Sequence, residues 1–95
     1  MGSDLTFSEA LEMLKEGFRM TRKGWNGKGM YVVMQRGYPE GIIANENTRN
    51  ALHLPEGAIV KVRPYLMMVD AQGMLVPWVA SQTDILAEDW TDIPL

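Results

Sequence analysis

The residues best suited to chemistry in this chain are the cations, tryptophan and glycines of residues 21–29, TRKGWNGKG. Arg22 and Lys28 offer charge-assisted hydrogen-bond donors to anionic oxygens such as those of a phosphate. Trp25 offers an aromatic face on which a nucleobase can stack. Asn26 and the glycine after it are typical of a tight hairpin turn, whose central residues need positive φ. The segment suits a phosphate and a base, but a hairpin with a solvated basic tip and a packed tryptophan would contain the same residues.

A second candidate segment is residues 77–90, PWVASQTDILAEDW. Ser81 and Asp84 have the spacing of a capping box, which predicts a helix start. A helix start exposes N–H groups that can hold a phosphate, or a sugar hydroxyl together with a carboxylate. Asp84 is therefore a candidate ligand contact, and plain capping is an equally good interpretation. Trp78 fits a stacking site or the core.

A recognisable catalytic set is missing from the sequence. His53 is the single histidine and lies between two leucines, so we interpret it as a packing or helix-end residue. Asp84, Glu88 and Asp89 are close in sequence, but carboxylates near a helix end are more often surface residues than metal ligands. Cysteine, the GxSxG pattern and the P-loop pattern are all absent. We therefore expect binding without catalysis, with no metal or cofactor, and we expect Trp90 in the core.

Local signals place both segments on one α+β domain that spans residues 1–95. Thr6 and Glu9 form a capping box, and apolar residues then recur with helical spacing until Gly17, whose type favours a helix end. Residues 1–3 precede the patterned sequence and are interpreted as a cloning remnant. The fold class predicted is a small antiparallel β-sheet packed by this N-terminal helix, with a short C-terminal helix that starts after Ser81 or Thr83.

The remaining elements are predicted from alternation, turn residues and β-branched content. A loop is expected at residues 37–41, because Gly37, Pro39 and Gly41 are typical of loops. A short edge strand is expected after it, at residues 42–44. A short helix capped by Asn45 is expected next. This helix is predicted to span residues 46–52. The other predicted strands are residues 18–23, 30–35, 58–62, 65–70 and 74–78.

Composition limits the classes of partner. A net charge of −3 and a pI of about 5.0 disfavour binding to a nucleic acid polymer. The apolar runs are too short to cross a membrane, and the lack of cysteine suits a reducing interior, so we expect a cytoplasmic protein. Hydrophobic residues make up 46% of the chain, including eight methionines, which leaves apolar surface for a further copy of the chain. We therefore expect a homo-oligomer.

Four blocks, in the same order along the chain, resemble the Thoeris anti-defence 2 family of phage proteins. The blocks are FSEALEMLKEG (7–17), TRKGWNGKGMYVV (21–33), VRPYLMM (62–68) and PWVASQTDILAEDW (77–90). The resemblance implies a phage protein that acts in the infected host cell by sequestering a cyclic nucleotide immune signal without degrading it. The implied signal is glycocyclic ADP-ribose, and for some relatives a cyclic dinucleotide.

The resemblance also implies a homotetramer whose ligand pockets lie between protomers. The residues it places against the ligand are Trp25, Asn26, Trp78, Thr83 and Asp84, with Arg22 and Lys28 as phosphate partners. Two other classes of function stay open. One is a phage accessory module that binds another protein through its tryptophan and methionine surface. The other is a small cyclic-nucleotide hydrolase, which the lack of a general base disfavours.

Overall fold

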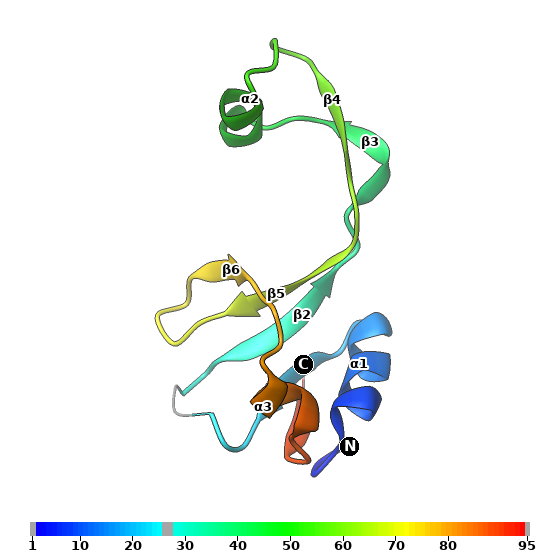
Figure 1. The fold of residues 1–95 in the computed structure, drawn as a ribbon, viewed down its shortest axis with the longest axis vertical. Helices are drawn as coiled ribbons and strands as arrows, with labels where there is room; N and C mark the ends of the chain where they lie inside the picture. Colours follow the sequence, from blue (N-terminus) through cyan, green and yellow to red (C-terminus); the bar gives the residue numbers. More distant parts are fainter. Residues whose placement is uncertain (1, 26–27, 95) are drawn as a thin grey trace.

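A computed structural model describes residues 2–25 and 28–94. The chain forms a body, which holds both termini, and an arm that extends from it (Figure 1). The elements in order are α1 (Phe7–Lys15), β1 (Arg19–Arg22), β2 (Tyr31–Gln35), β3 (Tyr38–Ile43), α2 (Glu46–Leu52), β4 (Ile59–Val62), β5 (Tyr65–Val69), β6 (Leu75–Pro77), α3 (Gln82–Leu86) and β7 (Trp90–Ile93). The predicted α+β class is confirmed, with an N-terminal helix and a short C-terminal helix.

The body is built on a five-stranded antiparallel sheet in the order β6-β5-β2-β1-β7. The central register places Val32 opposite Met20 on one side and Met68 on the other. Strand β7 was not predicted from the sequence, because its pairing partners, β1 and Leu5, lie far from it along the chain. This pairing brings the C-terminal segment beside the residues that follow α1.

Helix α1 starts and ends as its sequence predicts. The Thr6 hydroxyl accepts a hydrogen bond from the Glu9 backbone, and the Glu9 carboxylate accepts one from the Thr6 backbone. Gly17 follows the helix end with a φ of 99°. One stripe of α1 packs on the sheet, where the fully buried core side chains are Ala10, Leu14, Met20, Val32 and Trp90. The expected core position of Trp90 is confirmed.

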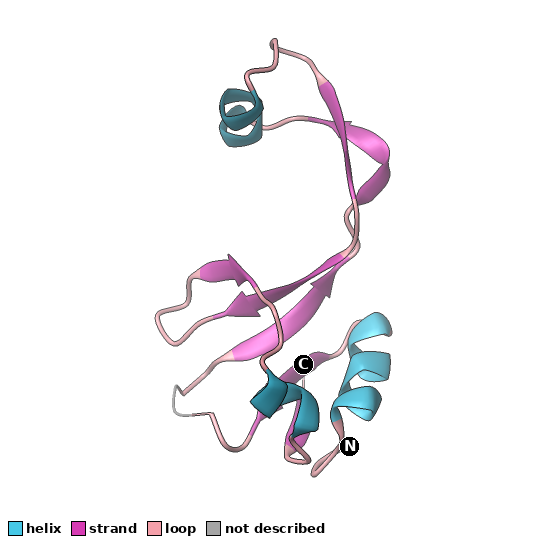
Figure 2. Cartoon of the chain, in the orientation of Figure 1, coloured by secondary structure: helices cyan, strands magenta, loops and turns pink. Residues whose placement is uncertain are grey.

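The arm is a separate two-stranded sheet of β3 and β4, with α2 at its far end (Figure 2). Because of it the chain measures 47 × 27 × 26 Å. Its radius of gyration is 15.6 Å, whereas a compact domain of this length would have about 12 Å. Helix α2 has the predicted bounds, its cap Asn45 accepts from Thr48 N, and His53 ends it in the left-handed conformation, as expected of a helix-end residue.

The predicted loop at residues 37–41 was wrong, since β3 already begins at Tyr38. Pro39 is tolerated because a strand of a two-stranded sheet has only one neighbour to which it donates. Gly41, at a φ of 108°, lies where the pairing register shifts between Tyr38 and Ile42. Glycine and proline therefore mark an irregular strand here and not a loop.

Residues near the N-terminus pack on the body. Gly2 N donates to Asp92 Oδ1 at 2.8 Å, and Gly2 O accepts from Thr91 Oγ1 at 2.8 Å.

None of the helices in the described part of the chain has the length and apolar character that a membrane span needs.

Candidate ligand-binding site

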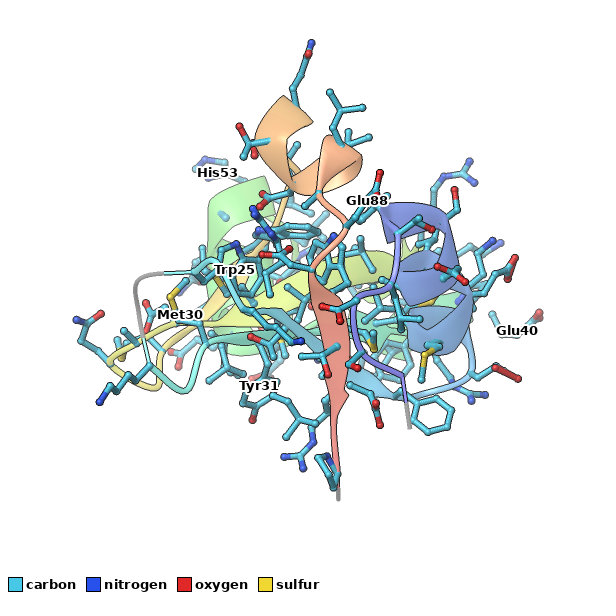
Figure 3. The ribbon with its side chains drawn as sticks, turned by 90° about the horizontal axis from the view of Figure 1, so that it is seen from below. Trp25, Met30, Tyr31, Glu40, His53 and Glu88 are labelled. Atoms are coloured by element: carbon cyan, nitrogen blue, oxygen red, sulfur yellow. The ribbon has the colours of Figure 1, made fainter. Side chains whose placement is uncertain are left out.

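The two segments singled out by the sequence meet at one end of the body. The indole Nε1 of Trp25 donates to Asp84 Oδ1 at 3.1 Å, although 59 positions separate the two residues. Trp25 follows β1, and Asp84 lies in the first turn of α3. Figure 3 shows Trp25 beneath α3 in that view. The predicted proximity of these two residues is therefore confirmed, whereas their contact with a ligand stays a prediction.

Arg22 pairs with two acidic residues of the C-terminal segment, Asp84 and Asp89. Its Nη1 lies 2.8 Å from Asp84 Oδ1, and its Nε lies 2.8 Å from Asp89 Oδ1. The three side chains are shielded from water, with exposed fractions of 13% for Arg22, 12% for Asp84 and 28% for Asp89. One guanidinium thus balances two carboxylates, which leaves a local formal charge of −1.

Asp84 also caps α3. Its Oδ2 accepts from Ser81 N at 3.1 Å and from Ser81 Oγ at 2.9 Å, and the Ser81 hydroxyl accepts from Asp84 N. Burial raises the pKa of Asp84, but the hydrogen bonds from Arg22, Trp25 and Ser81 outweigh it, so the pKa lies below its ordinary value. The predicted capping box is confirmed, and its carboxylate is ionised at neutral pH.

Asp89 holds the loop that carries Trp25 through hydrogen bonds. Besides its bonds to Arg22, its Oδ2 accepts from Gly24 N at 2.8 Å, and its backbone carbonyl accepts from Lys23 N at 3.2 Å. The Arg22 hydrogen bond lowers the pKa of Asp89 most, against a smaller effect of burial. A Cβ at Gly24 would lie 2.8 Å from Asp89 Oδ2, so a larger residue at this position would have to displace that carboxylate.

An aromatic cluster lies beneath this network. The ring centroids of Trp25 and Trp90 are 5.3 Å apart, and those of Trp25 and Trp78 are 6.2 Å apart, with both pairs edge to face. Phe7 of α1 packs against Trp78 and Trp90. Trp90 is fully buried and its Nε1 donates to the Asp84 carbonyl at 3.0 Å. Trp25 and Trp78 are half-buried residues, so neither is fully enclosed by the core.

The other predicted site residues are not part of this hydrogen-bond network as far as the structure describes them. Thr83 is exposed on α3, and Lys28 is exposed before β2. Asn26 and the Asn-Gly turn lie outside the described residues. Within the described ranges no group of three or more histidine, cysteine or acidic residues could hold a metal ion.

The role of Asp89 was missed in the sequence. The acidic run was interpreted as surface residues, which holds for Glu88, whereas Asp84 is buried and Asp89 is half-buried. The close neighbour of Gly24 in the structure is Asp89. The available signal was an arginine two positions before a glycine, together with the four acidic residues Asp84, Glu88, Asp89 and Asp92 near the other end of the chain.

Comparison with known proteins identifies the family of the chain. The Thoeris anti-defense 2-like domain family matches residues 5–93, which include both halves of the site. The chain belongs to this family. It is also similar to Thoeris anti-defense 2 of Bacillus phage SP01, at 32% identity over 90 residues that cover 95% of this chain and 96% of the relative. Membership in this family supports a phage anti-defence role.

Proposed function

We propose that this protein binds and sequesters a cyclic nucleotide immune signal of the glycocyclic ADP-ribose class, or a cyclic dinucleotide, without degrading it. The observation that carries the proposal is the pair of half-buried indoles, Trp25 and Trp78, beside the ionised network of Arg22, Asp84 and Asp89. Aromatic faces bind bases through stacking, and polar groups at their border select the rest of a nucleotide. Family membership supports the anti-defence purpose of such binding.

The proposed ligand contacts divide by chemistry. The ring planes of Trp25 and Trp78 are inclined at 71° to each other. The two rings therefore cannot hold one base between parallel faces. Thr83 and Asn26 are the proposed hydroxyl and amide contacts, and Lys28 is a proposed phosphate partner. Each of these contacts is a proposal based on the resemblance and on residue type.

Arg22 is proposed as a second phosphate partner, although most of its donors already bond to the protein. A guanidinium has five N–H donors. Three of them point to Asp84 and Asp89, including the longer bond from Nη2 at 3.4 Å. The remaining donors can serve a phosphate that reaches this shielded group.

The electrostatics of the network support binding over catalysis. A general base works best when its pKa lies near the operating pH. The pKa values of Asp84 and Asp89 are instead lowered by their hydrogen bonds to Arg22 and neighbouring donors. Such carboxylates are weak bases, which disfavours a hydrolase that would use them to activate water.

We also propose a homotetramer with ligand pockets between protomers, acting in the cytoplasm of the infected host cell. Large apolar side chains on the arm and on β6 support association, since Ile43, Ile59 and Leu75 are each more than 60% exposed. The same surface favours the alternative of an accessory module that binds another protein. That alternative predicts no retained small molecule.

The test is to incubate the protein with glycocyclic ADP-ribose, remove free ligand, denature the complex by heat and identify the released molecule by mass spectrometry. We expect intact ligand that still activates its effector. Trp25→Ala should weaken binding by about 1–3 kcal/mol through lost stacking. Recovery of a hydrolysed product in stoichiometric or greater yield would refute sequestration, and absence of any retained nucleotide would favour the protein-binding module.

A further inference from the structure

Asp84 has no acceptor position left for a ligand. An ionised carboxylate offers about four lone-pair sites. Oδ1 accepts from Arg22 Nη1 at 2.8 Å and from Trp25 Nε1 at 3.1 Å. Oδ2 accepts from the backbone and the hydroxyl of Ser81 at 3.1 and 2.9 Å. A ligand hydroxyl could bond to Asp84 only by displacing one of these donors.

Asp84 instead controls the orientation of an aromatic ring. The torsion that turns an indole about its Cβ–Cγ bond has broad minima, so packing and hydrogen bonds must fix the ring plane. Trp25 is half-buried, and its Nε1 bond to Asp84 anchors the polar edge of the ring. The Asp84 carbonyl also accepts from the fully buried Trp90, whose ring contacts Trp25 edge to face. Asp84 is thereby tied to the core.

On this geometry we infer that Asp84 is a positioning residue, which does not touch the ligand but holds the Trp25 indole in the orientation used for stacking. The inference rests on the proposed function for its purpose. Its structural part can be tested without any ligand. Sequence reasoning expected a direct hydroxyl contact by Asp84, and the two roles predict different results.

The ligand-free test uses the indole N–H resonances of tryptophan-labelled protein, with the Trp25 signal assigned by its loss in Trp25→Phe. Asp84→Ala should shift this signal and speed its exchange with water, and Asp84→Asn, which keeps an oxygen acceptor, should restore it in part. Ser81→Ala is the matched control, because it removes a capping bond of the same carboxylate on the side away from Trp25. A Trp25 signal that is unchanged in Asp84→Ala, or shifted as far in Ser81→Ala, would overturn the inference.

The binding test measures the affinity for glycocyclic ADP-ribose in a double-mutant cycle. Asp84→Ala should weaken binding about tenfold, the factor expected for one charge-assisted hydrogen bond. In a Trp25→Phe background, where no indole N–H exists to be held, the same change should cost less than about threefold. An equal factor in both backgrounds would assign a direct ligand contact to Asp84. If Asp84→Ala does not fold, Asp84→Asn takes its place in the cycle.

The two tests separate the two proposals. A wild-type protein that fails to bind glycocyclic ADP-ribose or a cyclic dinucleotide refutes the proposed function, while the indole signal still decides whether Asp84 positions Trp25. A wild-type protein that binds, combined with an unperturbed indole signal in Asp84→Ala, refutes only the positioning role.

Discussion

Replacing Arg22 with methionine should strongly destabilise the fold. Methionine keeps most of the length of the aliphatic stem and removes the guanidinium. The substitution leaves two carboxylates facing each other across the space that the cation occupied, with side chains only 12% and 28% exposed. Removing one partner of a shielded ion pair costs more than the pair itself contributes, because a buried charge loses its compensation.

The magnitude follows from the contacts. Two short charge-assisted hydrogen bonds, each contributing about 1.5–3 kcal/mol, are lost together with one longer bond. Partial exposure of Asp89 allows water to compensate in part, so we expect a loss of about 2–4 kcal/mol in the free energy of unfolding. For a domain of this size that corresponds to a fall in Tm of about 10–25 °C.

The assay is urea and thermal unfolding followed by circular dichroism at a fixed protein concentration. Lys23→Met is the matched control, since it removes a neighbouring cation by the same substitution. The ion pair of Lys23 with Asp4 has side chains 54% and 70% exposed. Its loss should cost less than about 1 kcal/mol. Equal effects of the two substitutions, or a change below about 1 kcal/mol for Arg22→Met, would refute the reasoning.

The same network predicts a pH dependence. Hydrogen bonds from Arg22 hold the pKa values of Asp84 and Asp89 below their ordinary values, against the opposing effect of burial. The stability they contribute is thus fully present above the carboxyl pKa of the unfolded chain, about 4, and is lost as the pH falls through the lower folded values. In Arg22→Met this acid-side loss should be smaller, which unfolding measured at pH values between about 2 and 6 would reveal.

The remaining predictions concern the loop and the assembly. Gly24→Ala should destabilise the protein by about 1–2 kcal/mol and disturb the Trp25 indole signal, because its Cβ would lie 2.8 Å from Asp89 Oδ2. Gly73→Ala, at a φ of 79° with open space around it, should destabilise by its backbone conformation alone and leave that signal unchanged. Light scattering at micromolar concentration should give the mass of a tetramer, and a mass near 10.7 kDa would argue against shared pockets.

Local structure was largely predictable from the sequence. The capping boxes at Thr6 and Ser81, the helix end at Gly17 and the bounds of α2 are each encoded by side chains that bond to backbone groups within a few residues. The chemistry of residues 21–29 and 77–90 was also visible, since residue type alone identifies stacking rings, cations and acids. These features need no knowledge of the fold because their partners lie nearby in the chain.

Partner choice between distant segments was decided by the tertiary structure. Arg22 could have paired with any of twelve acidic residues, and its charge does not specify Asp84 and Asp89. Pairing of β7 with β1 brings these acids to it, and the same pairing turns expected surface carboxylates into shielded hydrogen-bond acceptors. The sequence indicated which groups could bind a ligand. Burial and topology determined that Asp84 is already saturated by protein donors, because long-range contacts depend on how the whole chain packs and not on the residues beside them.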